Sequence, residues 1–249
     1  ATASLHARFD EHFTANNVAD DGSRRYPAVP ADIGFVRGGQ VGYVVANGAD
    51  SVFRVRYDVA QASAIPQVSS PTQPFINLNP AGIAADKSGQ NPIGIATPNQ
   101  DAHKRFAFVA NDVSRNVSVI DFNTQAIAGG ASDSAVVVRA SALPGENSTE
   151  DRIRKGKRFF NTATGRWSLK GQGWNGCQAC HMDGLSDNVT WFFARGPRQS
   201  TSLEGSFSKK DPKDQRLFNW TAIFDEVADF EGNTRGISGG VGAIVHTKS

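Results

Sequence analysis

This sequence has few cysteines, no long apolar segment and little net charge, and each shortage excludes a class of protein. Its 249 residues include two cysteines, so a small fold held together by several disulfides is excluded. No apolar run approaches the roughly 18 residues that a membrane-spanning helix needs, so we expect no membrane span. The formal net charge is only +2. We therefore expect no nucleic-acid partner, because phosphate binding usually needs a clearly basic face.

The composition changes sharply near residue 147. Residues 1–146 carry a net charge of −2 and no tryptophan, whereas residues 147–249 carry +4 and all four tryptophans. Such a step indicates a domain boundary, and the turn-forming pair Pro144-Gly145 lies beside it. We therefore expect two domains, 1–146 and 147–249. No secretion signal opens the chain, which fits either a processed start or a piece of a longer polypeptide.

Short strand-like segments dominate the first domain. The sequence predicts strands over 41–47 and 51–57 joined by a turn, and the same arrangement over 106–111 and 116–121. The triplet Val-Ala-Asn occurs in both hairpins. A repeated strand–turn–strand unit is typical of β-propeller blades, and two unrelated hairpins of a β-sandwich are the alternative.

The two repeats also carry a family resemblance. Tyr43-Val-Val-Ala-Asn47 and Phe108-Val-Ala-Asn111 resemble the Tyr-Val-Thr-Asn family of β-propeller repeats. The resemblance implies a partial propeller with an incomplete ring, because a blade usually takes about 40 to 50 residues. We expect the remaining blades on further segments of a longer polypeptide or on further chains.

Cys177-Gln-Ala-Cys180-His181 matches Cys-x-x-Cys-His, the attachment signature of c-type haem. The spacing lets two thiols reach the two vinyl groups on one edge of the porphyrin, and the next imidazole then lies beneath the iron. We therefore expect one covalent haem c, with His181 as its proximal iron ligand. A thioredoxin-like redox pair would sit in a βαβ pattern, which this sequence lacks, and zinc would need two more suitably spaced ligands.

A helix is expected just before this motif. Ser148 and Asp151 suit its first turn, and Ile153, Gly156 and Phe160 share one face of the segment 152–160. A helix with Gly and Phe at this distance from the haem cysteines resembles the first helix of cytochrome c domains. Its Arg/Lys run is more typical of a solvated face than of a docking site.

The chain after the motif widens the resemblance. His181-Met-Asp-Gly-Leu-Ser-Asp187, Gly196-Pro-Arg198 and Asp229-Phe-Glu231 are similar to the bacterial di-haem cytochrome c peroxidase superfamily. The resemblance implies an α-helical c-type cytochrome domain, so the expected fold class is a multidomain all-β plus all-α protein. Because the chain has a single Cys-x-x-Cys-His, a second haem would lie on a missing segment or a partner chain.

The same resemblance implies a function, namely electron transfer through the haem as part of a di-haem peroxidase-like oxidoreductase. Two alternatives stay open: an autonomous haem peroxidase that reduces hydrogen peroxide, and a propeller that binds a ligand and carries a structural haem. Covalent haem attachment takes place outside the bacterial cytoplasmic membrane, so we expect a periplasmic or secreted protein. Its expected partner is another redox protein.

Further candidate residues follow from the needs of a haem. Met182 directly follows the proximal histidine and cannot reach the opposite haem face, so His246 is the candidate distal ligand, with a surface histidine as the alternative. If the iron is open, the resemblance suggests Glu226 or Glu231 as the acid–base group, against the alternative of a solvated acidic face. Candidate partners of the porphyrin and its propionates are Trp191, Arg195, Arg198 and Arg235.

Overall fold

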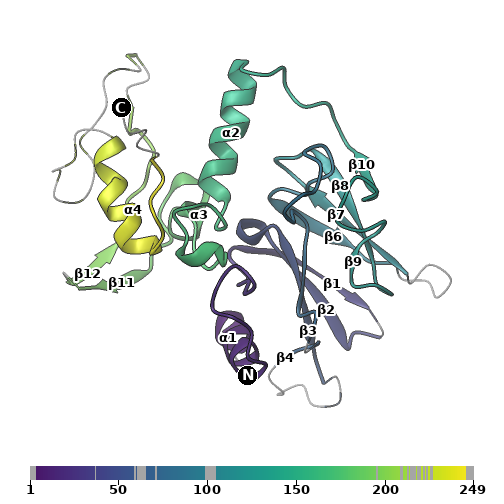
Figure 1. The fold of residues 1–249 in the computed structure, drawn as a ribbon. Coiled ribbons are helices and arrows are strands. Elements are labelled where there is room, and N and C mark those ends of the chain that lie inside the picture. The colour runs from purple at the N-terminus through teal and green to yellow at the C-terminus, as the bar shows by residue number, and fades with distance from the viewer. Residues whose placement is uncertain are drawn as a thin grey trace.

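A computed structural model shows two antiparallel sheets beside a mixed segment of short helices and one hairpin (Figure 1). The structure describes residues 4–36, 38–58, 60, 66–70, 72–98, 105–194, 196–207, 210, 211, 213, 217, 220, 222, 224 and 227–244. Within these ranges, no helix is both long and apolar enough to cross a membrane.

The first sheet is a meander in the order β1-β2-β3-β4, with β5 also paired to β3. Its strands are β1 (Pro30–Val36), β2 (Val41–Ala46), β3 (Ser51–Arg56), β4 (Gln67–Val68) and β5 (Phe75–Asn77). The 3-10 turn η1 (Asn47–Ala49) joins β2 to β3 and ends at Asp50 in the left-handed region, with φ of 48°. Asp tolerates this conformation better than most residues, which suits it to close the turn.

The second sheet repeats this plan. Its order is β10-β8-β7-β6, with β9 paired to β8. The strands are β6 (Pro92–Ala96), β7 (Phe106–Asn111), β8 (Asn116–Asp121), β9 (Ala126–Ile127) and β10 (Val137–Arg139). A register shift after the first proline occurs in both sheets, at Pro30 in β1 and at Pro92 in β6. The repeat inferred from Val-Ala-Asn is therefore visible in strand order and in strand irregularity.

The two sheets pack face to face around one hydrophobic core. Tyr43, Val45 and Val52 of the first sheet meet Val109 and Ile120 of the second, and all five side chains are buried. Strand β2 is buried along its whole length, because its other face is covered too. This explains why β2 reads as an unbroken apolar run instead of an alternating one.

Helix α1 (Leu5–Ala15) supplies that second cover. Phe9 and Phe13 are buried against Val44, Phe53 and Val55 on the outer face of the first sheet. Each buried phenylalanine contributes about 1.5–3 kcal/mol of burial free energy. Ser4 caps the helix by accepting a hydrogen bond from the Ala7 amide at 3.4 Å.

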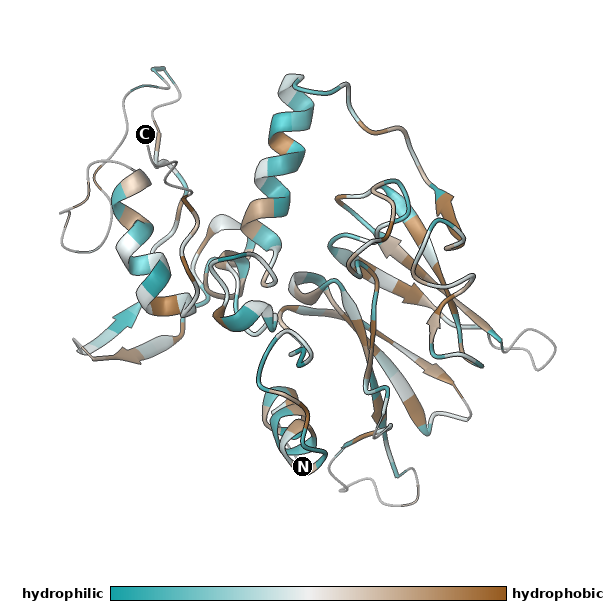
Figure 2. Ribbon diagram, viewed as in Figure 1, coloured by the Kyte–Doolittle hydropathy of each residue, from teal (hydrophilic) through white to brown (hydrophobic). Residues whose placement is uncertain are grey.

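The second half is a chain of short elements. Helix α2 (Thr149–Asn161) stands between the sheets and the C-terminal elements in Figure 1. It is followed by α3 (Cys177–Cys180), the hairpin β11 (Thr190–Phe193) and β12 (Gly196–Gln199), and α4 (Glu231–Ser238), with 3-10 turns η3 (Leu169–Gly171), η4 (Met182–Gly184) and η5 (Val227–Phe230). Hydrophilic residues cover most of α2 in Figure 2.

The expected fold class is wrong. The described residues are 23% helical. The first half forms two antiparallel sheets, and the described part of residues 147–249 contains short helices and a hairpin instead of an α-helical cytochrome domain. The helical domain was implied by the family resemblance, whereas the sequence itself predicts one well-capped helix with no further long apolar periodicity after it. In the first half the structure shows two packed sheets of one strand plan, with α1 covering the outer face of the first, and the incomplete propeller ring stays a prediction. The domain limits at 146 and 147 stay a prediction.

Candidate functional site

Helix α2 is anchored to the hairpin turns of both sheets by two consecutive cations. Arg158 forms an ion pair with Asp50 in the first turn, and Lys157 forms one with Asp112 in the second. Asp50 is 1% exposed, and its Oδ1 also accepts a hydrogen bond from the Asn91 amide at 2.8 Å. A buried carboxylate needs such a set of donors, because an unpaired one would be strongly destabilising.

The end of α2 is also fixed by close backbone contacts. The Ala163 amide donates to the Gly48 carbonyl at 2.7 Å. Further along the chain, Gly176 lies so near the same segment that a Cβ there would be 2.9 Å from the Thr162 oxygen. Glycine at 176 therefore lets α3 begin directly against the end of α2. These contacts position the cysteine motif relative to the sheets.

Cys177 and Cys180 lie on the single turn of α3, three residues apart and therefore on one face. Both are free thiols and half-buried. Burial raises the pKa of Cys177, and burial together with the charge of Asp187 and the neighbouring Cys177 raises the pKa of Cys180 to about 11. Reactive redox cysteines have lowered pKa values, so this pair does not have the electrostatics of a thioredoxin-like site.

His181 ends α3 with its ring orientation set by one hydrogen bond. Nδ1 lies 2.9 Å from the Thr201 carbonyl oxygen. A carbonyl oxygen can only accept, so Nδ1 carries the hydrogen and Nε2 keeps a lone pair. Metal-binding histidines are typically oriented in this way, with one ring N–H donated to a carbonyl or carboxylate. The Thr201 contact therefore leaves the Nε2 lone pair of His181 unused by this hydrogen bond.

Asp187 organises the loop that carries Thr201. Its carboxylate accepts hydrogen bonds from the Ser200 hydroxyl at 2.7 Å and from the Trp191 indole at 2.8 Å, and its own amide donates to the Cys180 carbonyl at 3.2 Å. Burial alone would raise the pKa of Asp187, but the donors from Ser200, Val189 and Trp191 bring it below its ordinary value. The loop after the motif is therefore tied back to it.

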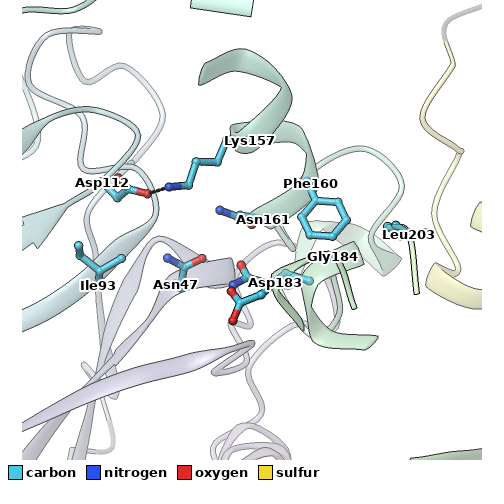
Figure 3. A pocket seen from close by; sticks show the side chains of 10 residues that line it. Asn47, Ile93, Asp112, Lys157, Phe160, Asn161, Asp183, Gly184 and Leu203 are labelled. Atoms are coloured by element: carbon cyan, nitrogen blue, oxygen red, sulfur yellow. Dashed lines mark ion pairs between the residues drawn. The ribbon is translucent and has the colours of Figure 1, made fainter. Parts of the chain in front are cut away.

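A cavity of about 570 Å³ opens between the sheets, α2 and the cysteine motif (Figure 3). It is lined by Asn47, Ile93, Asp112, Lys157, Phe160, Asn161, Gln178, Asp183, Gly184 and Leu203. Gln178 is the residue directly after the first cysteine, so one wall of the cavity belongs to the motif itself. The volume is within the usual range of small-molecule sites.

The other site residues predicted from the sequence, where the structure describes them, do not line this cavity. Glu231 of α4 pairs with Arg235 at 2.9 Å and accepts from the Ala243 amide at 2.9 Å. Burial favours a higher pKa for Glu231, but these donors and the Ile244 amide lower it. Arg198 is exposed and donates to the Pro197 carbonyl. Three candidates lie outside the described residues: Arg195, Glu226 and His246.

Comparisons with known proteins identify no family. No family model matches the chain, and no curated protein matches it either. Two solved structures are similar over part of it: a provisionally assigned 6-phosphogluconolactonase from Bacteroides uniformis (15% identity, TM-score 0.30, 45% of this chain and 27% of that chain) and the periplasmic gluconolactonase of Pseudomonas aeruginosa (20% identity, TM-score 0.33, 53% and 31%). The chain therefore spans about a third of their length or less.

These results correct the expected function. Electron transfer within a peroxidase-like oxidoreductase, like its two alternatives, was inferred together with an α-helical cytochrome domain. The described part of residues 147–249 contains short helices and a hairpin instead. In the described ranges, no three His, Cys, Asp or Glu side chains form a group that could hold a metal ion.

Sequence reasoning missed the residues that build the surroundings of the motif. Asp50 and Arg158 carry the junction between the halves, Thr201 orients His181, and Asn161 faces the cavity. A signal existed for the junction, because an acid closes each repeated turn and two adjacent cations occur in α2. No signal existed for Thr201, since its contribution is a backbone carbonyl.

Proposed function

We propose that this chain binds one haem c covalently, through thioether bonds from Cys177 and Cys180, with His181 as an iron ligand. The proposal concerns cofactor binding alone. The hydrogen bond from His181 Nδ1 to the Thr201 carbonyl, 2.9 Å long, is the observation that carries it. It leaves Nε2 free to bind iron, one residue after a pair of free thiols on one helical face.

The surroundings of the motif fit this group. Met182, Leu185 and Leu203 are apolar and exposed. Met182 and Leu185 follow His181 closely in the chain. The Leu203 amide donates a hydrogen bond to the Gly184 carbonyl, which brings Leu203 to the same segment. Exposed apolar clusters of this kind usually mark a surface that something covers. A porphyrin bound at the two cysteines would cover part of it.

The donor set fits a haem better than the other candidates. Protonated, half-buried thiols suit thioether attachment, whereas a zinc site or a redox dithiol needs stabilised thiolates. The haem supplies an iron centre when bound. This chain's own residues fix its position: the cysteines hold one edge, His181 binds the metal, and Thr201 sets the imidazole orientation. Attachment implies export from the bacterial cytoplasm, so we also propose a periplasmic or secreted location.

The test is expression of the whole chain with an export signal in bacteria that make c-type cytochromes. We expect coloured protein whose mass exceeds that of the polypeptide by one haem, and whose colour stays with the protein after acid–acetone extraction. A Cys177→Ser/Cys180→Ser variant serves as the matched control and should lose the covalent haem. Colourless protein with both thiols free, under conditions that mature a control cytochrome, would contradict the proposal.

A further inference from the structure

The hairpin of β11 and β12 lies at the periphery of the molecule and exposes aromatic side chains (Figure 1). Phe192 is 83% exposed, and its neighbours Trp191 and Phe193 are exposed as well. Neither face of β11 is buried by the rest of the described chain. A two-stranded hairpin without a packed face is marginally stable in water, and an exposed aromatic cluster usually marks a surface that another molecule covers.

The free hydrogen-bonding edge of this hairpin belongs to β11. Phe192 lies opposite Pro197 in the register, and proline has no N–H. Opposite residues of an antiparallel pair exchange both hydrogen bonds or neither, so the Phe192 amide and carbonyl point away from β12. Among the described residues, no hydrogen bond from another segment reaches either group. An unpaired main-chain edge of this kind is a template for a further strand.

The outer edge of β12 is closed in two ways. Pro197 offers no donor there, and the Gln199 carbonyl already accepts a hydrogen bond from the Trp220 indole at 2.8 Å. Natural sheets block their edge strands with proline and with charged side chains, and β12 also carries Arg198. The hairpin can therefore gain a strand on the β11 side alone, which limits pairing to a closed twofold assembly.

The residues of β11 suit an identical strand. The strand carries no charged side chain, so two copies can pair without like charges opposite each other. A twofold axis at Phe192 sets this residue against its own copy, and sets Trp191 against Phe193 of the partner subunit. Aromatic pairs of this kind stabilise neighbouring strands. The two Arg198 side chains would lie three strand spacings apart, about 14 Å, which exceeds the Debye length of about 8 Å at physiological salt.

We propose that β11 is a dimerisation edge, through which two copies of this chain pair antiparallel about a twofold axis at Phe192 and form a four-stranded sheet. None of the residues of β11 is among those that the proposed function gives to the porphyrin, so the dimer does not depend on the haem. Three aromatic side chains from each copy make an interface smaller than the roughly 1,200 Å² that stable complexes bury. We therefore expect a weak dimer, with a dissociation constant on the order of 10–100 µM.

The experiment is sedimentation equilibrium of the whole chain as isolated, from about 5 to about 500 µM. We expect a reversible monomer–dimer equilibrium without larger species. Phe192→Lys changes an exposed side chain and places like charges at the twofold axis, so it should remove the dimer. The matched control is Phe108→Lys. Phe108 is 45% exposed, but β7 is paired on both sides, so this variant should dimerise like wild type.

A cross-linking comparison distinguishes strand pairing from loose apolar contact. In the Cys177→Ser/Cys180→Ser background, Phe192→Cys places two thiols opposite each other, with Cα atoms about 5.5 Å apart, a distance that a disulfide spans. Thr190→Cys places its two thiols about 13 Å apart along the strands. Copper-catalysed air oxidation should therefore link copies of the first variant much faster than copies of the second.

Three outcomes would overturn the proposal. The wild-type chain could stay monomeric at about 500 µM, Phe192→Lys could dimerise as wild type does, or the two cysteine variants could cross-link at the same rate.

Discussion

Arg158 Nη1 lies 2.8 Å from Asp50 Oδ1, a contact that joins helix α2 to a hairpin turn 108 residues earlier. Arg158 also donates to the Asn91 side chain at 3.0 Å, and Asn79 donates to Asp50 Oδ2 at 3.3 Å. The carboxylate is therefore surrounded by donors from both sheets and from α2. This network ties α2 to both sheets, beside the backbone contact between Ala163 and Gly48.

Replacing Asp50 should be strongly destabilising. Asp50→Asn keeps the left-handed turn geometry, which Asn tolerates, but leaves the half-buried Arg158 charge without its partner. We expect a loss of about 3 kcal/mol in the free energy of unfolding. The matched control is Glu11→Gln, which breaks the more exposed Arg8–Glu11 pair and should cost less than about 1 kcal/mol. Urea unfolding of both variants measures these losses. Equal urea midpoints for Asp50→Asn and Glu11→Gln would contradict the role of the network.

Acid should destabilise the fold through carboxylates whose pKa is lowered. Lys155, Arg154 and the Asn147 amide hold the pKa of Asp151 far below its ordinary value of 3.8, and Arg105 lowers that of Asp121. The unfolded chain then binds more protons than the folded chain in this range. Their stabilisation is fully present above about pH 4–5 and is lost as the pH falls through the folded-state pKa values.

The measurement is the thermal midpoint between pH 7 and pH 2. We expect a plateau above about pH 5 and a steep fall below pH 4. Asp151→Asn should lower the plateau and flatten the fall, because its proton-linked contribution is gone. A wild-type midpoint that rises on acidification below pH 4 would show that the assigned direction of these pKa shifts is wrong.

The raised pKa of Cys180 predicts slow thiol chemistry in the haem-free chain. Burial first, and then the charges near the thiol, raise its pKa to about 11, so only a small fraction is thiolate at pH 8. Iodoacetamide should therefore modify Cys180 in the folded Cys177→Ser variant more slowly than in the same variant in urea. Its rate should keep rising with pH beyond 9. Saturation of the rate below pH 9 would contradict the burial argument.

The haem-loaded chain allows a test of His181 that is separate from attachment. His181→Ala keeps both cysteines, so we expect covalent haem to remain after extraction while the absorption spectrum changes with the loss of an iron ligand. Added imidazole should restore the wild-type spectrum, because it can occupy the vacated position. The control is His12→Ala on helix α1, which should leave the spectrum unchanged. A His181→Ala spectrum identical to wild type would exclude His181 as a ligand.

The strands could be predicted because their pattern is local. Apolar runs separated by Asn- and Asp-containing turns specified β2, β3, β7 and β8 to within one or two residues. Helix α2 was equally local, since Ser148 caps it through the Asp151 amide at 3.1 Å. Helix α1 was missed, although Ser4, Phe9 and Phe13 carry a capped helical spacing.

The junction and the cavity could not be predicted, because they depend on contacts between distant parts of the chain. The Asp50–Arg158 pair has no meaning until both hairpins and α2 are placed, and Asn161 is unremarkable as the last residue of a helix. The cysteine motif, in contrast, could be recognised from the sequence alone. Its spacing suggested haem directly, and it stays a prediction until attachment is measured.

The location of the partner of Asp50 has a consequence for synthesis on the ribosome. Residues 1–146 emerge first, and during that interval the acid of the first turn has no cation from α2 to meet. Until α2 follows, the Asp50 carboxylate has the donors of Asn79 and Asn91 but lacks the countercharge of Arg158. A chain cut before α2 should therefore carry an Asp50 carboxylate with a weaker set of donors, and the first turn should gain its full stability only when α2 docks.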